Sequence, residues 1–333
     1  MFYSENQERG FRRLTQFLPF VFVPLTLLSE NLDKNKILKL IRYFGYYIVV
    51  ILSILLILQV LFYGPFFNLE HGAFLKLKIT NFYFSAFIYM AILVFLFDLK
   101  KNAFKIHLNY VFILFLTVCL ILLSARIAIF ILFVCLAIFF YSTFNSVSKK
   151  KRILVLLLSL SLLTFASYQV PQIKTKVNIA LKTADFDFKT ILTKNQITIT
   201  RNSLEYRIII NYCGFLILKD NILGVGLGDN EDVLYRKYQE INFKAGIKEK
   251  YNFHNQYMEE LTKHGLIGGV IFITLILYSI LVGFKKKQYL FYVSLYIMLV
   301  CLVESYLNRQ HGIMFTAFFL PLFYNLEKRS KDE

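Results

Sequence analysis

Long apolar segments separated by short basic clusters constrain this chain more than any other feature of its sequence. Such segments occur at about 41–63, 81–99, 107–124, 126–145, 153–170, 265–284, 288–306 and 312–326. A helix needs about 20 apolar residues to cross the hydrocarbon core of a membrane, and 57% of the 333 residues are hydrophobic. The sequence therefore predicts an all-α polytopic membrane protein with about eight or nine transmembrane helices.

The cations between these segments predict which loops face the cytoplasm. They form clusters at Lys100, Lys101 and Lys105, at Lys149 to Arg152, at Lys285 to Lys287, and at Lys328, Arg329 and Lys331. A formal net charge of +17 would favour nucleic-acid binding in a soluble protein, but cations beside membrane spans are typical of the cytoplasmic side. We therefore expect membrane lipids, and no nucleic acid, among the partners of this protein.

This sidedness divides the chain into three parts. Residues 1–170 would form an N-terminal transmembrane bundle, residues 171–264 a large exported loop with short amphipathic helices, and residues 265–333 C-terminal transmembrane helices with a basic cytoplasmic tail. Residues 14–29 are apolar but short, contain two prolines and have cations on both sides. They predict either a re-entrant or interfacial hairpin with cytoplasmic ends, or a true span with an exported N-terminus.

Polar and glycine residues gather in one stretch, 201–268, inside this otherwise apolar chain. Residues 203–218 have apolar side chains at helical spacing and predict an amphipathic helix with Arg207 near its start. A second short helix should cover 230–238, with Asp229 or Asn230 as its cap. A third should begin near Asn255 and continue into the span at 265. Polar chemistry is therefore expected in this stretch.

Three arginines are candidates for binding an anion. Arg201 and Arg207 can converge on one phosphate group, because a guanidinium presents a planar fork of donors. Arg126 lies in the turn Ser124-Ala125-Arg126 between two apolar helices, which is an expensive place for a charge. The alternatives are interfacial contacts of Arg201 and Arg207 with lipid headgroups, and a purely structural helix-end role for Arg126.

His254 and Glu304 are the candidates for proton transfer. His254 lies just before an apolar helix, where an imidazole can exchange a proton or donate to an oxyanion, although a structural role at the helix start is an alternative. Glu304, followed by Arg309, is either a general base or the partner of an arginine. Gly224, Gly226 and Gly228 lack the lysine of a nucleotide loop and predict a tight turn. No histidine or cysteine has metal-ligand spacing.

In this order, these elements resemble the O-antigen ligase superfamily, which also includes O-antigen polymerases of the bacterial inner membrane. The matching elements are Ser124 to Arg126, Arg207 with its helix, Asp220 to Asp229, Tyr235 to Tyr238, His254 to Tyr257, Gly265 to Gly268 and Glu304 to Gly312. Gly-Asp after the glycine turn and His-Asn-Gln-Tyr resemble the form in Bacteroidetes-type bacteria. The chain looks short by some N-terminal helices. Many relatives also have an acidic residue where this chain has Lys263, which leaves His254 and Glu304 as candidate bases.

The resemblance implies transfer of a glycan from undecaprenyl diphosphate to a hydroxyl of lipid A-core or of another glycan, at the periplasmic face of the inner membrane. It implies no cofactor, nucleotide or metal. The implied diphosphate-binding residues are Arg126, Arg201, Arg207 and Arg309, the implied catalytic residues are His254 and Glu304, and the implied pocket-shaping residues are Gly224, Gly226, Gly228, Asp229, Asn255 and Tyr257.

Other functions stay open beside this one. A polysaccharide polymerase of the same superfamily would use the same donor. A membrane transporter or flippase would need ionisable residues midway along its spans and internal symmetry, and neither is evident in the sequence. A non-catalytic partner in glycan assembly is a further alternative.

Overall fold

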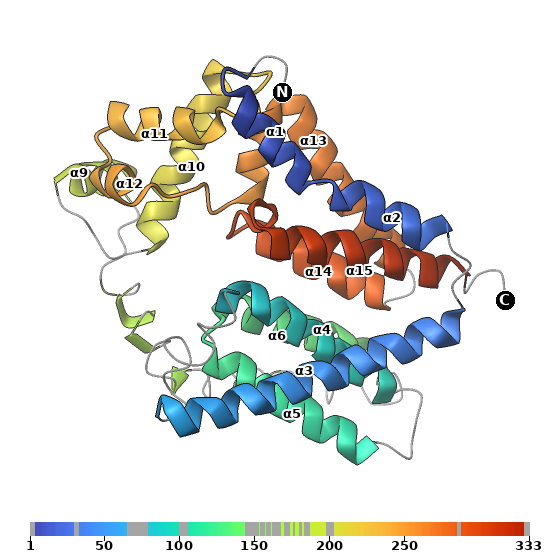
Figure 1. The fold of residues 1–333 in the computed structure, drawn as a ribbon. Helices are drawn as coiled ribbons and strands as arrows, with labels where there is room; N and C mark the ends of the chain where they lie inside the picture. Colours follow the sequence, from blue (N-terminus) through green and yellow to red (C-terminus); the bar gives the residue numbers. More distant parts are fainter. Residues whose placement is uncertain are drawn as a thin grey trace. The chain divides into compact units, whose positions relative to one another are not determined.

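The computed structural model describes residues 4–29, 33–64, 79–99, 106–143, 187–197, 203–284 and 288–329, with scattered positions between 153 and 182. Within these residues every regular element is a helix and no strand occurs (Figure 1), which confirms the all-α prediction. Contacts divide the chain into two compact units. Unit 1 comprises residues 1–25, 176–281 and 297–318, and unit 2 comprises residues 26–175, 282–296 and 319–333. The three-part division by membrane side stays a prediction.

Unit 2 is built around one almost entirely buried helix. Its main helices are α3 (Lys34–Phe62), α4 (Asn81–Leu99), α5 (Ile106–Leu122) and α6 (Arg126–Thr143). Helix α4 packs against α3 and α5 and is buried from Tyr83 to Asp98 apart from Phe87. At its end Asp98 forms an ion pair with Arg42 of α3. Its apolar sequence without a polar face is what a helix surrounded by others requires.

The predicted turn before Arg126 is present. Helix α5 ends at Leu122 and α6 begins at Arg126, and Ser124 between them adopts a left-handed φ of 54°. The amide of Arg126 donates to the carbonyl of Ser124 at 2.9 Å. Arg126 itself is exposed, so the turn spares this charge the cost of burial.

Among the described helices, three are long and apolar enough to cross a membrane: α3, α4 and α13 (Gln256–Phe284). Apolar helices that are shorter occupy 107–122, 126–142 and 289–301. The predicted spans from 41 to 145 thus coincide with α3 to α6, whereas 153–170 falls mostly outside the described residues. Helix α14 (Tyr289–Cys301) ends before the predicted 306, and α15 (Gln310–Arg329) extends beyond the predicted 312–326. The membrane-helix character is clear, and the number of spans stays a prediction.

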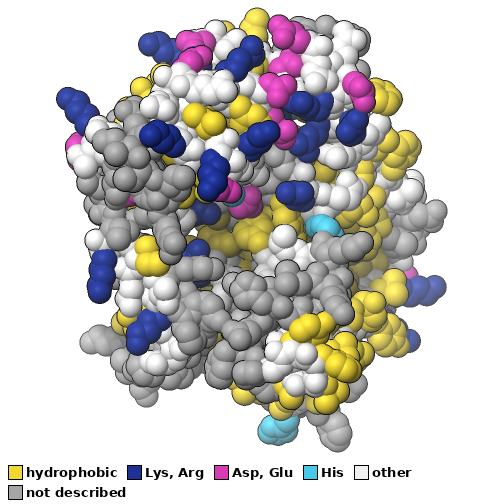
Figure 2. Space-filling view, turned by 60° about the vertical axis from the view of Figure 1, so that its left-hand side comes forward, with side chains coloured by type: hydrophobic (Ala, Val, Ile, Leu, Met, Phe, Trp, Pro, Cys, Tyr) yellow, Lys and Arg dark blue, Asp and Glu magenta, His cyan; other side chains and the backbone are white. Residues whose placement is uncertain are grey.

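Unit 1 contains the polar stretch and has a hydrophobic core of its own. Its helices include α9 (Phe188–Ile197), α10 (Ser203–Asp220), α11 (Asn230–Glu240) and α12 (Lys244–Glu249), together with most of α13. The helices expected at 203–218, at 230–238 and from 255 are thereby confirmed. The buried core comprises Ile191, Ile209, Ile210, Cys213, Ile217, Leu234, Tyr238, Phe243, Ala245 and Phe253. Cations and anions are interspersed on the surface over these helices, in the upper part of Figure 2.

The glycine turn holds a break in α13. Gly265 has a φ of 70° and interrupts the helical backbone, so carbonyls in the preceding turn lose their helical partners. The amides of Val225 and Gly226 donate instead to the carbonyls of Thr262 and Lys263, at 2.9 and 3.0 Å. A Cβ on Gly224 would lie only 2.4 Å from the amide nitrogen of Gly265. The two segments can therefore approach this closely only because both positions are glycine.

The N-terminal part forms two helices, α1 (Gln7–Gln16) and α2 (Pro19–Ser29). Helix α1 contacts the start of α11, although 223 positions separate Arg9 from Asp232 in the sequence. This contact is visible where α1, in dark blue, meets the segment before α11 (Figure 1). The apolar segment predicted at 14–29 thus begins within the last turn of α1, which is an amphipathic and polar helix, and continues through α2.

Candidate active site

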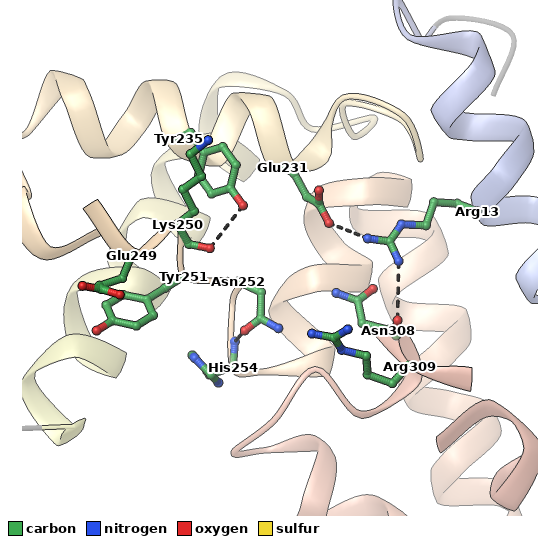
Figure 3. A pocket seen from close by; sticks show the side chains of 10 residues that line it. All are labelled: Arg13, Glu231, Tyr235, Glu249, Lys250, Tyr251, Asn252, His254, Asn308 and Arg309. Atoms are coloured by element: carbon green, nitrogen blue, oxygen red, sulfur yellow. Dashed lines mark hydrogen bonds and ion pairs between the residues drawn. The ribbon is translucent and has the colours of Figure 1, made fainter. Parts of the chain in front are cut away.

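A polar pocket of about 350 Å³ lies within unit 1. Its lining residues come from α1, α11, α12, the loop before α13 and the loop before α15: Arg13, Glu231, Tyr235, Glu249, Lys250, Tyr251, Asn252, His254, Asn308 and Arg309. His254 lies on one side, and Arg13 and Asn308 lie on the other (Figure 3). The pocket therefore brings two predicted site residues, His254 and Arg309, to one cavity.

His254 forms a pair with Glu304. Nδ1 of the imidazole lies 3.1 Å from Oε2 of the carboxylate, and the two side chains are 30% and 21% exposed. A carboxylate can only accept, so Glu304 holds the hydrogen on Nδ1 and leaves the lone pair of a neutral ring on Nε2. The two residues proposed separately from the sequence are thus joined in one hydrogen bond that orients the imidazole.

The backbone around His254 is fixed in an unusual conformation. Its φ is 45°, in the left-handed region that non-glycine residues rarely adopt. The amide of His254 donates to Oδ1 of Asn252 at 3.1 Å. On the other side, Oδ1 of Asn255 accepts from the amides of Tyr257 and Met258 and so caps α13. These polar side chains compensate for the local strain and place His254 immediately before the helix.

Two tyrosines of α11 hold the loop that carries His254. The Tyr235 hydroxyl donates to the Lys250 carbonyl at 3.2 Å, and the Tyr238 hydroxyl donates to the Tyr251 carbonyl at 3.1 Å. Burial raises the pKa of Tyr238 well above its ordinary value, so it stays a neutral donor at physiological pH. The predicted importance of 235–238 is therefore explained by support of the pocket wall.

A buried charged network lies beneath the pocket and was not predicted. Nζ of Lys263 is 2.6 Å from Oε1 of Glu259, with side chains 4% and 2% exposed, and it donates to Oδ1 of Asn308 at 3.2 Å. The side chain of Gln256 donates to Glu260 at 2.6 Å and accepts from the amide of Leu307 at 2.7 Å. Helix α13 is thereby tied to the loop that carries Arg309. Glu259, Glu260 and Lys263, spaced three and four positions apart just before an apolar span, were the available signal.

Arg207 and Asn255 are linked through one further residue. Asn211 donates from Nδ2 to the Arg207 carbonyl at 2.7 Å, and its Oδ1 accepts from Nδ2 of Asn255 at 2.9 Å. Arg207 is half-buried on α10 and does not line the described pocket. The Tyr257 hydroxyl donates to the Met298 carbonyl at 2.9 Å. Asn255 and Tyr257 thus support the site from its helix and do not line the cavity.

The remaining predicted residues lie elsewhere. Gly224 and Gly226 hold the break in α13, while Gly228 and Asp229 contact α1, and none of these four lines the pocket. Arg126 belongs to unit 2, and Arg201 is outside the described residues. The described part of the chain has no group of three or more metal-ligating side chains. Metal independence stays a prediction.

Comparison with known proteins supports the resemblance seen in the sequence. Residues 111–273 match the family model described as O-antigen ligase, and this range includes the turn at Arg126, the glycine turn and His254. The family suggests glycosyltransferase-like activity on polysaccharide or lipid-linked substrates in general. No curated protein matches the chain. The match over residues 111–273 therefore supports the O-antigen ligase superfamily for this chain.

Proposed function

We propose that this protein transfers a glycan from undecaprenyl diphosphate to a hydroxyl of lipid A-core, at the periplasmic face of the bacterial inner membrane. The observation that carries the proposal is the His254–Glu304 pair at 3.1 Å, beside a pocket that also contains Arg309 and Lys250. A base and fixed cations are what this reaction needs. The family match supports the superfamily that includes both ligases and polymerases, and a polysaccharide polymerase is the alternative.

The chemistry follows from the orientation of the imidazole. The acceptor hydroxyl attacks the anomeric carbon of the glycan, and its O–H bond breaks as Nε2 of His254 takes the proton. The bond from the anomeric carbon to the phosphate oxygen breaks at the same time, and its electron pair stays on the diphosphate. Glu304 stabilises the imidazolium that forms. A new glycosidic bond and undecaprenyl diphosphate are the products.

Arg309 and Lys250 serve the leaving group. Negative charge accumulates on the diphosphate oxygens as the sugar bond breaks, and cations held in place before the reaction stabilise that charge without reorganising. Arg309 is exposed, its guanidinium extends into the pocket in Figure 3, and its carbonyl accepts the Gly312 amide at the start of α15. The helix start thus fixes the backbone from which this cation reaches the pocket.

Transfer in a reconstituted system tests this proposal. The purified protein in lipid nanodiscs would receive an undecaprenyl-diphosphate-linked glycan and a lipid A-core acceptor. Arg309→Ala should lower transfer about 10- to 100-fold, because one charge-assisted phosphate contact contributes about 1.5–3 kcal/mol. Arg236→Ala is the matched control, since Arg236 is exposed on α11 and does not line the pocket. Equal activity of both variants would remove Arg309 from the site.

The lipopolysaccharide bands of a deletion strain would identify the acceptor in cells. Loss of every glycan-capped lipopolysaccharide band in a deletion strain supports the ligase, whereas caps of a single repeat would assign the protein as a polymerase. Transfer that persists in EDTA supports metal independence, and loss that is restored by a divalent cation would overturn it.

The proposal also requires the pocket to face the periplasm. A cysteine at Lys248, which is 68% exposed, should react with a membrane-impermeant maleimide in intact spheroplasts. A cysteine at Lys286 should react only after permeabilisation. Lys237 is less suitable because it pairs with Asp220 and Glu240 and is only 16% exposed. The buried Cys213, whose pKa burial raises to about 12, gives little background. The reverse pattern would exclude a periplasmic donor.

A further inference from the structure

The N-terminal helix α1 is anchored beside the pocket by one buried carboxylate. Asp229 accepts from the Ser4 hydroxyl at 2.9 Å, from the Glu5 amide at 2.7 Å and from the Asn6 amide at 2.9 Å. A Cβ on Gly228 would lie 2.0 Å from the Asn6 carbonyl oxygen. Gly228 and Asp229, the Gly-Asp pair after the glycine turn, therefore bind the residues that begin α1. Asp229 makes no side-chain cap to α11, which was one role expected for it.

The anchor is ionised at working pH. Burial opposes ionisation of Asp229, but hydrogen bonds from the Asn6 amide, the Ser4 hydroxyl and the Glu5 amide outweigh this effect and lower its pKa. An ion pair of 2.8 Å between Arg9 and Asp232 adds a second attachment one turn along α1. The Arg9 guanidinium also donates to the Gly228 carbonyl at 3.4 Å. Helix α1 is thus held at two successive points.

This docking places Arg13 in the pocket wall. Arg13 lies four positions after Arg9, on the same face of α1. Its Nη2 is 2.5 Å from Oε1 of Glu231, and its Nη1 donates to the Asn308 carbonyl at 3.4 Å. The side chain is 22% exposed, and Figure 3 shows it across the pocket from His254. Arg13 therefore connects α11 to the loop that carries Arg309.

We propose that α1 is part of the substrate site and that Arg13 is an additional binding residue for the diphosphate of the donor. The inference rests on the proposed function. Arg13, Lys250 and Arg309 contribute three cations to the pocket, against Glu231 and Glu249, so the lining is cationic before His254 is counted. Glu231 orients the guanidinium, whose planar fork suits phosphate oxygens.

The same contacts assign the N-terminus to one side of the membrane. Helix α1 binds residues 228–232, so it lies on the face that carries the pocket. A periplasmic pocket then requires a periplasmic α1, which selects the exported N-terminus from the two alternatives that the sequence left open.

Binding of inorganic pyrophosphate to the full-length protein in detergent tests Arg13 directly. Pyrophosphate stands in for the donor's diphosphate, and its dissociation constant can be measured by titration calorimetry. Arg13→Ala should weaken binding about 10- to 100-fold, and Arg13→Lys should weaken it less, because it keeps the charge but loses the fork. Arg12→Ala is the matched control. Arg12 is the neighbouring arginine on α1; it pairs with Glu8, is 71% exposed and does not line the pocket.

A charge reversal tests the docking without touching the pocket lining. Neither Arg9 nor Asp232 lines the pocket. Arg9→Asp and Asp232→Arg should each lower the unfolding temperature and weaken pyrophosphate binding, and the double variant should recover both. Such recovery cannot come from a merely misfolded protein.

The outcomes separate this inference from the proposed function. Weaker binding in Arg309→Ala but unchanged binding in Arg13→Ala would overturn the role of Arg13 and leave the pocket intact. Charge reversals without effect on binding would show that α1 is not part of the site. Wild-type protein that does not bind pyrophosphate, yet transfers glycan, would overturn the diphosphate assignment of Arg13, together with that of Arg309 and Lys250, and would leave the transfer reaction itself standing. Absence of both binding and transfer would overturn the two proposals together.

Discussion

Replacing Glu304 by Gln should slow the chemical step while leaving the pocket intact. The side chains of Glu304 and His254 face each other at 3.1 Å. Gln has nearly the same shape as Glu but carries no charge, so it cannot stabilise an imidazolium electrostatically. If its NH2 group turns toward Nδ1, the hydrogen of the ring moves to Nε2, and the base loses its lone pair. Either effect lowers kcat.

The size of the effect follows from distance and exposure. Two unit charges about 4 Å apart attract each other by about 1 kcal/mol in water and by about 4 kcal/mol at an effective dielectric constant near 20. The side chains of His254 and Glu304 are 30% and 21% exposed, so the pair lies between these limits. With 1.36 kcal/mol for each tenfold change, kcat should fall about 5-fold to about 10³-fold.

Steady-state kinetics in nanodiscs would measure this fall. The KM for the lipid-linked donor should change little, because Glu304 does not line the cavity. Glu249→Gln is the matched control, since Glu249 is a carboxylate of the pocket lining, whereas the carboxylate that pairs with His254 is that of Glu304. A Glu304→Gln variant with the kcat of the wild type would refute the orienting role.

Two variants of His254 complete the test. If His254 is the general base, His254→Ala and His254→Gln should both lose about 10² to 10⁴ in rate. If His254 only donates a hydrogen bond to phosphate, Gln can still donate and should retain much more activity than Ala. Near-wild-type rates for both would assign His254 to a structural role.

The remaining predictions concern the elements that support the site. Gly265→Ala should strongly lower the unfolding temperature, because its Cβ would lie 2.3 Å from the carbonyl carbon of Leu223; Gly64→Ala, which also has a positive φ but an open environment, should cost only about 1–2 kcal/mol. Lys263→Met should destabilise the protein by about 3–5 kcal/mol in chemical denaturation, because it leaves buried Glu259 without its cation, and an unchanged midpoint would contradict this. Because the folded-state pKa of Asp229 is lowered, its contribution to docking is complete above the ordinary carboxyl pKa and is lost as pH falls through the lower folded value. Between about pH 5 and pH 8, hydrogen exchange of residues 7–16 should therefore be slow and independent of pH once intrinsic rates are corrected, and Asp229→Asn should speed it throughout this range.

Much of the helical framework could be predicted from composition and periodicity. The span at 81–99 coincides with α4, and the amphipathic pattern at 203–218 with α10. The lengths of α14 and α15 could not be predicted. The chain leaves the helical conformation after Cys301, and the segment that follows brings Glu304 to His254. The break at Gly265 was also not predictable, since it depends on backbone contacts with Gly224, and no local pattern encodes that approach.

The site was predicted as single residues and not as an arrangement. His254, Glu304 and Arg309 were each recognised from their position beside apolar segments, but the pairing of residues 50 positions apart in the sequence depends on the tertiary fold. Arg13 was missed because cations before the first apolar segment were interpreted by their effect on topology. Arg13 lies four positions after Arg9, and the two arginines pair with Glu231 and Asp232 at the start of α11. This pattern becomes informative only when the contact between α1 and α11 is known.

The buried network on α13 explains how two separate loops come to share one pocket. His254 precedes the helix directly, and Gln256 and Lys263 hold Leu307 and Asn308 of the other loop. The spacing between His254 and Arg309 is therefore set by two turns of one helix, which is the rigid support that a preorganised site needs. The glycine turn stabilises the end of those two turns, because the amides of Val225 and Gly226 donate to carbonyls that the break at Gly265 leaves without helical partners. Residues that do not line the pocket, Gln256 and Lys263 among them, thus fix its geometry.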